Sequence, residues 1–271
     1  MKKVEFGVEF RSEIWYNIRL MLGSGKDLVF GQRDRFVLEV RDIGFSYYGE
    51  RILKGVSFVV SPGESVCIVG GNGAGKTTLM RVLSTLAVAE SGKILVDGKD
   101  ALAKVESYRK NLGYLPEVIG LYDDMTVKEY LLYRAKLKGE GMRRLRRRVK
   151  EAAEVCLLGE KMRVLIRDLS LGYRKRVALA DVIMLRPRLV LLDDFLAGLD
   201  HEMRVQAREI LSNVAAFSSV VMTGHEVEDL ALSATRFLVL KGGVIAGEVV
   251  TAGMESAAVV EKVNSLLEGE G

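Results

Sequence analysis

The sequence contains one uninterrupted glycine-rich motif, Gly70-Gly71-Asn72-Gly73-Ala74-Gly75-Lys76-Thr77. It matches the pattern G-x-x-x-x-G-K-[ST]. An apolar run, Ser65–Val69, precedes it, and residues 76–86 follow with helical spacing, as this motif requires. Glycines let such a loop curl until several backbone N–H groups point at phosphate oxygens, and the N-terminus of the helix adds its dipole. This context makes a chance glycine-rich loop a poor explanation, so we predict a nucleotide-phosphate site.

The end of the motif supplies the polar side chains of the predicted site. Lys76 would reach the β- and γ-phosphates, and the Thr77 hydroxyl would ligate Mg²⁺. The expected cofactors are therefore ATP and Mg²⁺. The predicted phosphate-binding residues are Gly70, Gly71, Asn72, Gly73, Ala74, Gly75, Lys76, Thr77 and Thr78.

A second motif ends in two acidic residues. The apolar run Leu189–Leu192 is followed by Asp193 and Asp194. Asp193 would hold Mg²⁺ through water, and Asp194 would polarise the water that attacks the terminal phosphate. Taken alone, such a run is more often a strand end followed by a helix cap. Together with the glycine-rich loop, it predicts a site of nucleotide hydrolysis.

Composition excludes several other classes of protein. The chain has 271 residues, of which 49% are hydrophobic and 28% charged, with a net charge of +4. These values suit a globular protein with a substantial core. The two cysteines, Cys67 and Cys156, show no metal-site spacing and suggest neither a disulfide framework nor a zinc site. No apolar stretch approaches the roughly 18 residues that cross a bilayer, so we expect separate subunits to supply any membrane-spanning part.

Residues 1–35 differ in pattern from the rest. Ile14, Trp15, Ile18 and Leu22 share one face of a predicted amphipathic helix. Three interpretations remain open: an extra helix packed on this domain or on a partner, an interfacial helix that uses Trp15, and an over-extended translation start.

The remaining chain alternates strand-like and helix-like segments. The expected fold class is α/β, with a mostly parallel core sheet, an antiparallel β part and an inserted helical subdomain over about 105–186. The expected domains are an N-terminal extension at 1–35, an ATP-binding domain at 36–250 and a C-terminal helix at 251–271. The expected strands lie at 36–47, 52–60, 65–69, 92–98, 189–192, 220–223, 237–241 and 244–250.

Two features lie in the expected helical subdomain. Thr126 and Glu129 have the spacing of a capping box, which predicts a helix start. The run Arg143–Arg148 is rich in arginine and reads as a solvated helix face. Nucleic-acid binding is the less favoured interpretation, because no aromatic residues are interleaved for base stacking.

Leu169-Ser170-Leu171-Gly172-Tyr173 resembles the signature motif of the ATP-binding cassette (ABC) family, usually Leu-Ser-Gly-Gly-Gln. It lies just upstream of Leu189–Leu192, as the family has it. Four further family motifs follow the same chain order. They are the adenine-stacking aromatic at Tyr48 (or Tyr47), the Q-loop position at Glu117, the D-loop at Ala197-Gly198-Leu199-Asp200 and the switch histidine at His225.

The resemblance implies a dimeric ATPase. In this family two cassettes close head to tail on two ATP molecules, so Ser170 and Gly172 would contact the γ-phosphate held by the second cassette. Glu117, His225, Asp194 and Lys76 would take catalytic roles, and Glu117 would also be near the metal. Closure would drive separate transmembrane permease subunits from the cytoplasmic face of a membrane. The pattern is most similar to cassettes of ABC-2-type exporters, which implies export.

Three departures from the family affect these expectations. Asp194 stands where the family has glutamate, Glu117 where it has glutamine, and Leu171 and Tyr173 alter the signature. Aspartate is one methylene shorter than glutamate, which predicts slow hydrolysis or pairing with a second, competent cassette. A soluble ATP-switched protein without transport remains the alternative of a different class.

Overall fold

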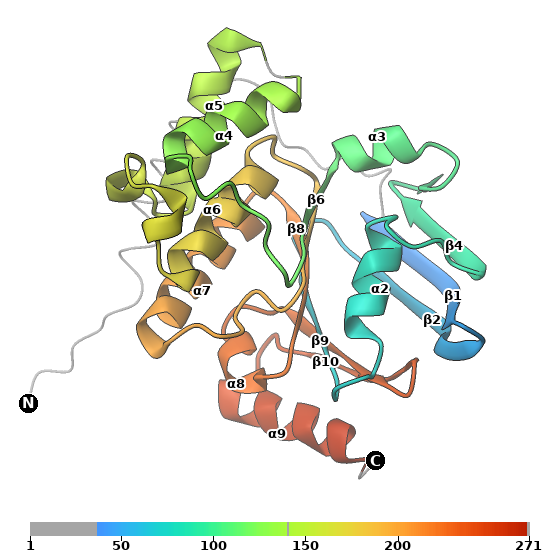
Figure 1. Ribbon diagram of the computed structural model, residues 1–271. Coiled ribbons are helices and arrows are strands. Elements are labelled where there is room, and N and C mark those ends of the chain that lie inside the picture. Colours follow the sequence, from blue (N-terminus) through green and yellow to red (C-terminus); the bar gives the residue numbers. More distant parts are fainter. Residues whose placement is uncertain (1–36, 140, 270–271) are drawn as a thin grey trace, which may run out of the picture. The chain divides into compact units, whose positions relative to one another are not determined.

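The computed structural model describes residues 37–139 and 141–269 (Figure 1). The helix expected within 1–35 lies outside these residues. The strands are β1 Leu38–Tyr47, β2 Glu50–Val60, β3 Ser65–Val69, β4 Ser91–Val96, β5 Lys99–Asp100, β6 Leu112–Leu115, β7 Leu189–Leu192, β8 Ser219–Gly224, β9 Arg236–Lys241 and β10 Val244–Val250. The α-helices are α2 Lys76–Leu83, α3 Val105–Lys110, α4 Val127–Leu137, α5 Met142–Val155, α6 Leu171–Ile183, α7 His201–Ala215, α8 Val227–Leu230 and α9 Ser256–Glu268.

A six-stranded sheet in the order β10-β9-β3-β8-β7-β6 forms the centre of the described part. Its strands are parallel except for β10, which returns antiparallel to β9. All residues of β3, β7 and β8 are buried, which explains why these strands read as continuous apolar runs. Val69 pairs with Gly224, and Leu192 pairs with both Met222 and Leu115. The carboxyl ends of β3, β8, β7 and β6 therefore meet at one edge.

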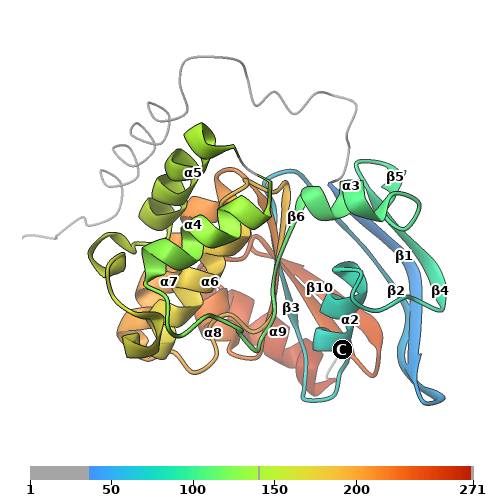
Figure 2. The same cartoon turned by 45° about the horizontal axis from the view of Figure 1, so that its top comes forward.

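A four-stranded antiparallel sheet in the order β2-β1-β4-β5 stands beside it. Helix α2 lies between the two sheets (Figure 2). Its residues Leu79, Met80 and Leu83 are fully buried in the core that both sheets share. The mostly parallel sheet and the antiparallel β part are thus confirmed, and the start of α2 is fixed between two packed layers.

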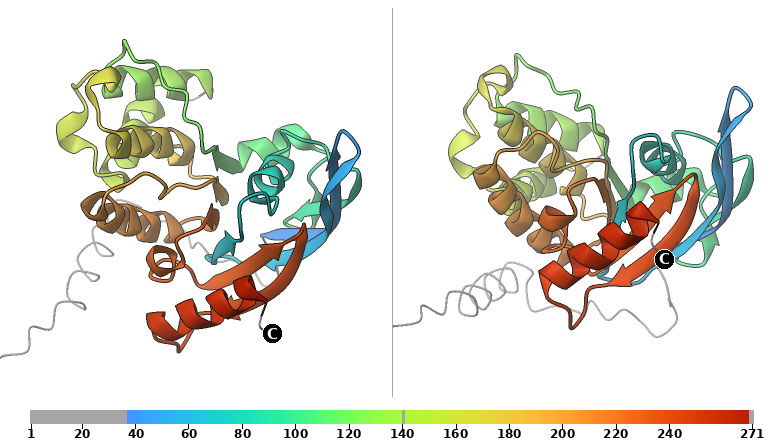
Figure 3. Two further views of the ribbon diagram at one scale, coloured as in Figure 1. Left: turned by 60° about the horizontal axis from the view of Figure 1, so that its bottom comes forward. Right: turned by 90° about the horizontal axis from the view of Figure 1, so that it is seen from below.

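Helices α6 and α7 pack on the opposite face of the parallel sheet, α4 and α5 pack against α6, and α9 packs along β9 and β10 (Figure 3). One part of the segment expected to be mainly helical differs: Leu112–Leu115 is strand β6 and pairs with β7. Glycine is depleted in strands, so Gly113 weakened the strand signal here. The strand needs this glycine, because a Cβ would lie 2.6 Å from Cγ1 of Val182.

Several local expectations are confirmed. The side chain of Thr126 and that of Glu129 form the capping box at the start of α4. The arginines at 143, 144, 146 and 147 are exposed on α5. One expected helix is shorter than predicted. The helix expected at 76–86 ends at Leu83, and Thr85 adopts a left-handed conformation with φ of 61°. No helix among the described residues is long and apolar enough to span a bilayer.

Helices α4 and α6 are joined by an ion-pair cluster around a buried carboxylate. The Asp181 carboxylate on α6 lies 2.9 Å from the guanidinium of Arg134 and 2.7 Å from the ammonium of Lys138. Lys138 also donates a hydrogen bond to the main-chain carbonyl of Asp181. Burial is unfavourable for each charge alone, so the members of the cluster depend on one another.

We expect Asp181→Ala to lower the free energy of unfolding by about 3 kcal/mol, because two cations would lose their buried counterion. Urea denaturation measures the change. Asp124→Ala is the matched control, since Asp124 pairs with Arg167 but its side chain is 92% exposed. An exposed pair is worth below about 1 kcal/mol. Equal losses in the two variants would contradict this assignment.

Candidate nucleotide-hydrolysing site

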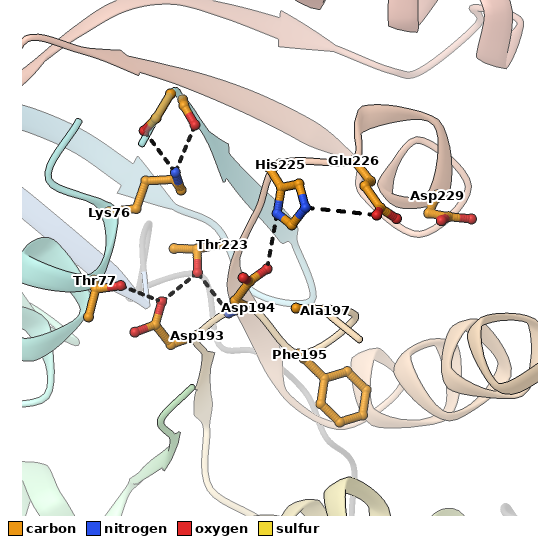
Figure 4. A network of polar contacts seen from close by, with 12 residues as sticks. Lys76, Thr77, Asp193, Asp194, Phe195, Ala197, Thr223, His225, Glu226 and Asp229 are labelled. Carbon is orange, nitrogen blue, oxygen red and sulfur yellow. Dashed lines mark hydrogen bonds and ion pairs between the residues drawn. The ribbon is translucent and has the colours of Figure 1, made fainter. Parts of the chain in front are cut away.

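Predicted site residues follow the four strands that end at the same edge of the parallel sheet (Figure 4). The glycine-rich loop 70–75 follows β3, and Asp193 and Asp194 follow β7. His225 follows β8, and Glu117 comes two residues after β6. The topology brings together residues more than 100 positions apart in the chain.

The glycine-rich loop runs from β3 into the first turn of α2, where Lys76, Thr77 and Thr78 lie. Gly75, which precedes the helix, has φ of 103°, a conformation that glycine adopts without strain. The Lys76 ammonium donates to the carbonyls of Gly70 at 2.7 Å and Gly71 at 3.1 Å. The side chain thus folds across its own loop, beside the N–H groups at the start of α2.

The Asp193 carboxylate links α2 and β8. Its Oδ1 accepts hydrogen bonds from the hydroxyl of Thr223 at 2.6 Å and from that of Thr77 at 3.4 Å. Burial raises the pKa of Asp193 above its ordinary value, while the two hydroxyl donors act in the opposite direction. Its other oxygen, Oδ2, has no hydrogen-bond partner among the described residues.

Asp194 stands in an unusual backbone conformation, with φ of 49°. Its N–H donates to Oγ1 of Thr223 at 2.9 Å. Its carboxylate faces His225, with 3.6 Å between Asp194 Oδ1 and His225 Nδ1. The other ring nitrogen of His225 lies 3.8 Å from Glu226, and the imidazole is 54% exposed. A half-exposed acid–imidazole pair at this edge is suited to orienting water.

These oxygens fit a hard divalent cation. Mg²⁺ is usually bound by one or two protein oxygens together with water and phosphate oxygens. The Thr77 hydroxyl and the unpartnered Oδ2 of Asp193 offer such a set. No group of three or more His, Cys, Asp or Glu side chains that could form an all-protein metal cage occurs among residues 37–139 and 141–269.

Glu117 is exposed, and no hydrogen bond or ion pair within the described residues joins it to Thr77 or Asp193. Its charge does reach the site: burial lowers the pKa of Lys175, and the charges of Asp194 and Glu117 oppose that shift. The catalytic and metal roles expected for Glu117 stay predictions.

The signature residues lie at the start of α6. Ser170 is exposed and caps the helix, its Oγ accepting from the N–H of Tyr173 at 3.5 Å. Gly172 is buried, and a Cβ there would lie 2.7 Å from Sδ of Met203 on α7. A larger residue at 172 would have to displace the Met203 side chain, and Ser170 at the N-terminus of the helix stays exposed.

Of the two candidate aromatic platforms, Tyr48 is the available one. Tyr47 packs edge-on against Phe45, with 4.7 Å between the ring centroids. Tyr48 lies in the turn between β1 and β2 and is fully exposed. Contact with adenine stays a prediction for Tyr48.

The sequence reasoning missed three residues that contact these predicted ones. Thr223 holds both Asp193 and Asp194, and Lys175 donates to the carbonyl of Asp194. Arg204 donates to the carbonyl of Leu199 in the predicted D-loop and also binds Glu226, which is next to His225. Of these three residues, only Thr223 could have been suspected from the sequence. It is a polar residue near the end of an apolar run, and the predicted functional residue His225 follows that run.

Comparison with known proteins finds relatives of this chain. A family model described as "ABC transporter" matches residues 53–197. The sn-glycerol-3-phosphate import ATP-binding protein UgpC 3 of Rhizobium etli is 32% identical over 211 residues, which are 77% of this chain and 60% of that protein. The Nod factor export ATP-binding protein I of Rhizobium etli is 29% identical over 207 residues, which are 76% of this chain and 66% of that protein.

This chain spans less than two thirds of the length of those two relatives. Among solved structures, cbiO1 from Clostridium perfringens, described as part of the ABC transporter complex cbiONQ, superposes with a TM-score of 0.76. The match covers 85% of this chain and 93% of that one, at 24% sequence identity. That likeness supports the α/β fold described above.

We expect Thr223→Val to lower the free energy of unfolding by about 1–3 kcal/mol, because Asp193 would lose its 2.6 Å donor inside the protein. Thermal unfolding measures the change. Thr223→Ser keeps the hydroxyl and should cost less than half as much. A valine variant as stable as wild type would show that this hydrogen bond does not hold Asp193.

Proposed function

The chain belongs to the ABC transporter family, whose ATP-binding subunits hydrolyse ATP to drive transport, and we propose that it is such a subunit, acting on separate membrane subunits. The observation that carries the proposal is the meeting of Thr77, Asp193 and the Asp194–His225 pair at one sheet edge, beside the loop of Lys76. These are the groups that binding and hydrolysing a nucleoside triphosphate require.

Nucleotide binding would begin at the glycine-rich loop. The Lys76 ammonium would exchange two carbonyls of its own loop for oxygens of the β- and γ-phosphates. The N-terminus of α2 would also favour the negative charge of the phosphates. Thr77 and Asp193 would hold Mg²⁺, which neutralises charge on the phosphate oxygens, and Tyr48 would stack on the adenine.

Hydrolysis would depend on Asp194 and His225. Asp194 would orient and polarise the attacking water as a general base, and His225, 3.6 Å away, would fix that carboxylate and contact the γ-phosphate. The shorter aspartate holds its carboxylate back from the water by more than about 1 Å, and misplacement on that scale can cost about 10²-fold in rate. Slow turnover, or pairing with a faster second cassette, is part of the proposal.

A second cassette would complete the site. The exposed Ser170 and the N-terminus of α6 have the geometry to bind an anion supplied by another copy or by a different cassette. Membrane subunits would dock beside Glu117, where Tyr122, Asp123 and Asp124 also lie, and the chain would work at the cytoplasmic face of a membrane. Export stays a prediction, since one relative is named for import and the other for export.

The experiment that tests this function is purification of the tagged chain from detergent-solubilised native membranes, followed by mass spectrometry. We expect a polytopic membrane protein to co-purify in stoichiometric amount. ATP with Mg²⁺ should be hydrolysed by the purified complex, and Lys76→Ala should abolish turnover while the complex remains intact.

Recovery of soluble partners alone, with the chain absent from the membrane fraction, would contradict the transport role. An ATP-dependent switch acting on those partners would then replace it. Mass spectrometry would also show whether a second, different cassette is present.

We expect Asp194→Glu to raise kcat by about tenfold or more, with KM unchanged, because the added methylene carries the carboxylate toward the water. Steady-state ATPase measurements test this. Asp194→Asn is the control: it keeps the length and tolerates the left-handed backbone but lacks the charge, so turnover should be lost. A glutamate variant that is no faster than wild type, while hydrogen exchange of residues 194–199 is unchanged, would show that carboxylate reach does not limit hydrolysis.

A further inference from the structure

Lys175 is a buried lysine on α6, five residues after Ser170, and only 6% of it is exposed. Its ammonium donates three hydrogen bonds to another segment of the chain. The acceptors are the carbonyls of Asp194 at 3.2 Å, Phe195 at 2.9 Å and Ala197 at 2.6 Å. An ammonium has three N–H donors, so every donor of Lys175 is used on this one segment.

The segment 194–199 depends on hydrogen bonds from side chains outside it. It has no strand or helix of its own, and Asp194 and Gly198 both have positive φ, at 49° and 70°. Within it, only two turn bonds are formed, from Ala197 N to Asp194 O and from Leu199 N to Leu196 O. Lys175 therefore supplies the donors that regular secondary structure would otherwise provide.

Nearby carboxylates help to stabilise the buried ammonium of Lys175. Burial lowers the pKa of Lys175, and the carboxylates of Asp194 and Glu117 oppose that effect. A buried ammonium is stable only when carbonyl dipoles or opposite charges compensate for the lost water. The lysine thus lies within electrostatic reach of the two acidic residues at which this chain departs from its family.

A second cation holds the far end of the same segment. Arg204 on α7 donates to the carbonyl of Leu199 at 2.8 Å and to Oε1 of Glu226 at 2.9 Å. Glu226 is adjacent to His225 in sequence and 3.8 Å from its imidazole. The segment is therefore attached to α6 at its start and to the histidine-bearing turn at its end.

We propose that Lys175 is a positioning residue for ATP hydrolysis, which fixes the Asp194 backbone to the helix that begins at Ser170. The inference rests on the proposed function, in which Asp194 serves the nucleotide of its own loop and Ser170 that of a second cassette. Through Lys175, the position of helix α6, which Ser170 caps, determines the position of the Asp194 backbone. Because Lys76 and the glycine-rich loop lie on different elements, nucleotide affinity does not depend on Lys175.

The test uses Lys175→Met, which keeps the length of the side chain and removes all three donors. Hydrogen exchange of residues 194–199 is measured on the nucleotide-free protein, and kcat and KM on the same preparation with ATP and Mg²⁺. We expect exchange in this segment to be faster by about tenfold, kcat to fall by about 10- to 100-fold and KM to stay within about twofold. Lys175→Arg keeps charge and donors and should recover part of kcat.

Lys138→Met is the matched control. Lys138 is also a mostly buried lysine that donates to a main-chain carbonyl, that of Asp181 at the other end of α6. Its loss should lower the unfolding temperature and leave kcat and exchange at 194–199 unchanged.

Three results separate the possibilities. Wild-type exchange and kcat in Lys175→Met would overturn the proposal. A loss of kcat no larger than that in Lys138→Met would also overturn it, because the effect would then be one of stability alone. A wild-type complex without ATPase activity would instead contradict the proposed function, while the exchange measurement would still decide whether Lys175 holds the segment.

Discussion

The Asp193 carboxylate lies in the interior, where a charge is stable only with compensating donors or cations. Its donors come from elsewhere: Thr77 at the start of α2 and Thr223 at the end of β8. Both are in reach only because β7 pairs with β8, and β8 with β3, in the observed register. A slip of one residue in the pairing of β7 with β8 would turn Thr223 to the opposite face of the sheet. The chemistry of the site therefore depends on strand pairing.

The cations of the site are divided between two parts of the molecule. Lys76 belongs to the loop after β3, and Lys175 belongs to α6 in the helical block. Both donate to main-chain carbonyls, but only Lys76 uses acceptors within its own motif. Lys76 can therefore be released to a phosphate without loosening another element, whereas releasing Lys175 would free the segment after Asp194. Lys76 is therefore available to bind a ligand, whereas Lys175 stabilises the protein segment after Asp194.

The sequence predicted the parts of the site whose chemistry is local. The glycine-rich loop and the run before Asp193 carry their signal within a few residues, as does the capping box at Thr126 outside the site, and the structure contains all three. Thr223 had a local signal and Lys175 had none, but the partners of neither residue could be found in this way. Their partners lie 30 and 19 to 22 residues away. Those pairings follow from sheet order and helix packing, which periodicity does not specify.

The aspartate at 194 is consistent with its backbone. Aspartate and asparagine enter the left-handed region more readily than most residues, whereas glutamate has no short side chain that could bond locally there. The N–H of Asp194 is held by Thr223 and its carbonyl by Lys175. With both sides of the residue fixed, the backbone cannot move forward to compensate for a missing methylene. The reach of the carboxylate toward a bound nucleotide is then determined by side-chain length alone, so the same contacts that order this segment also limit how closely its acid approaches the reacting water.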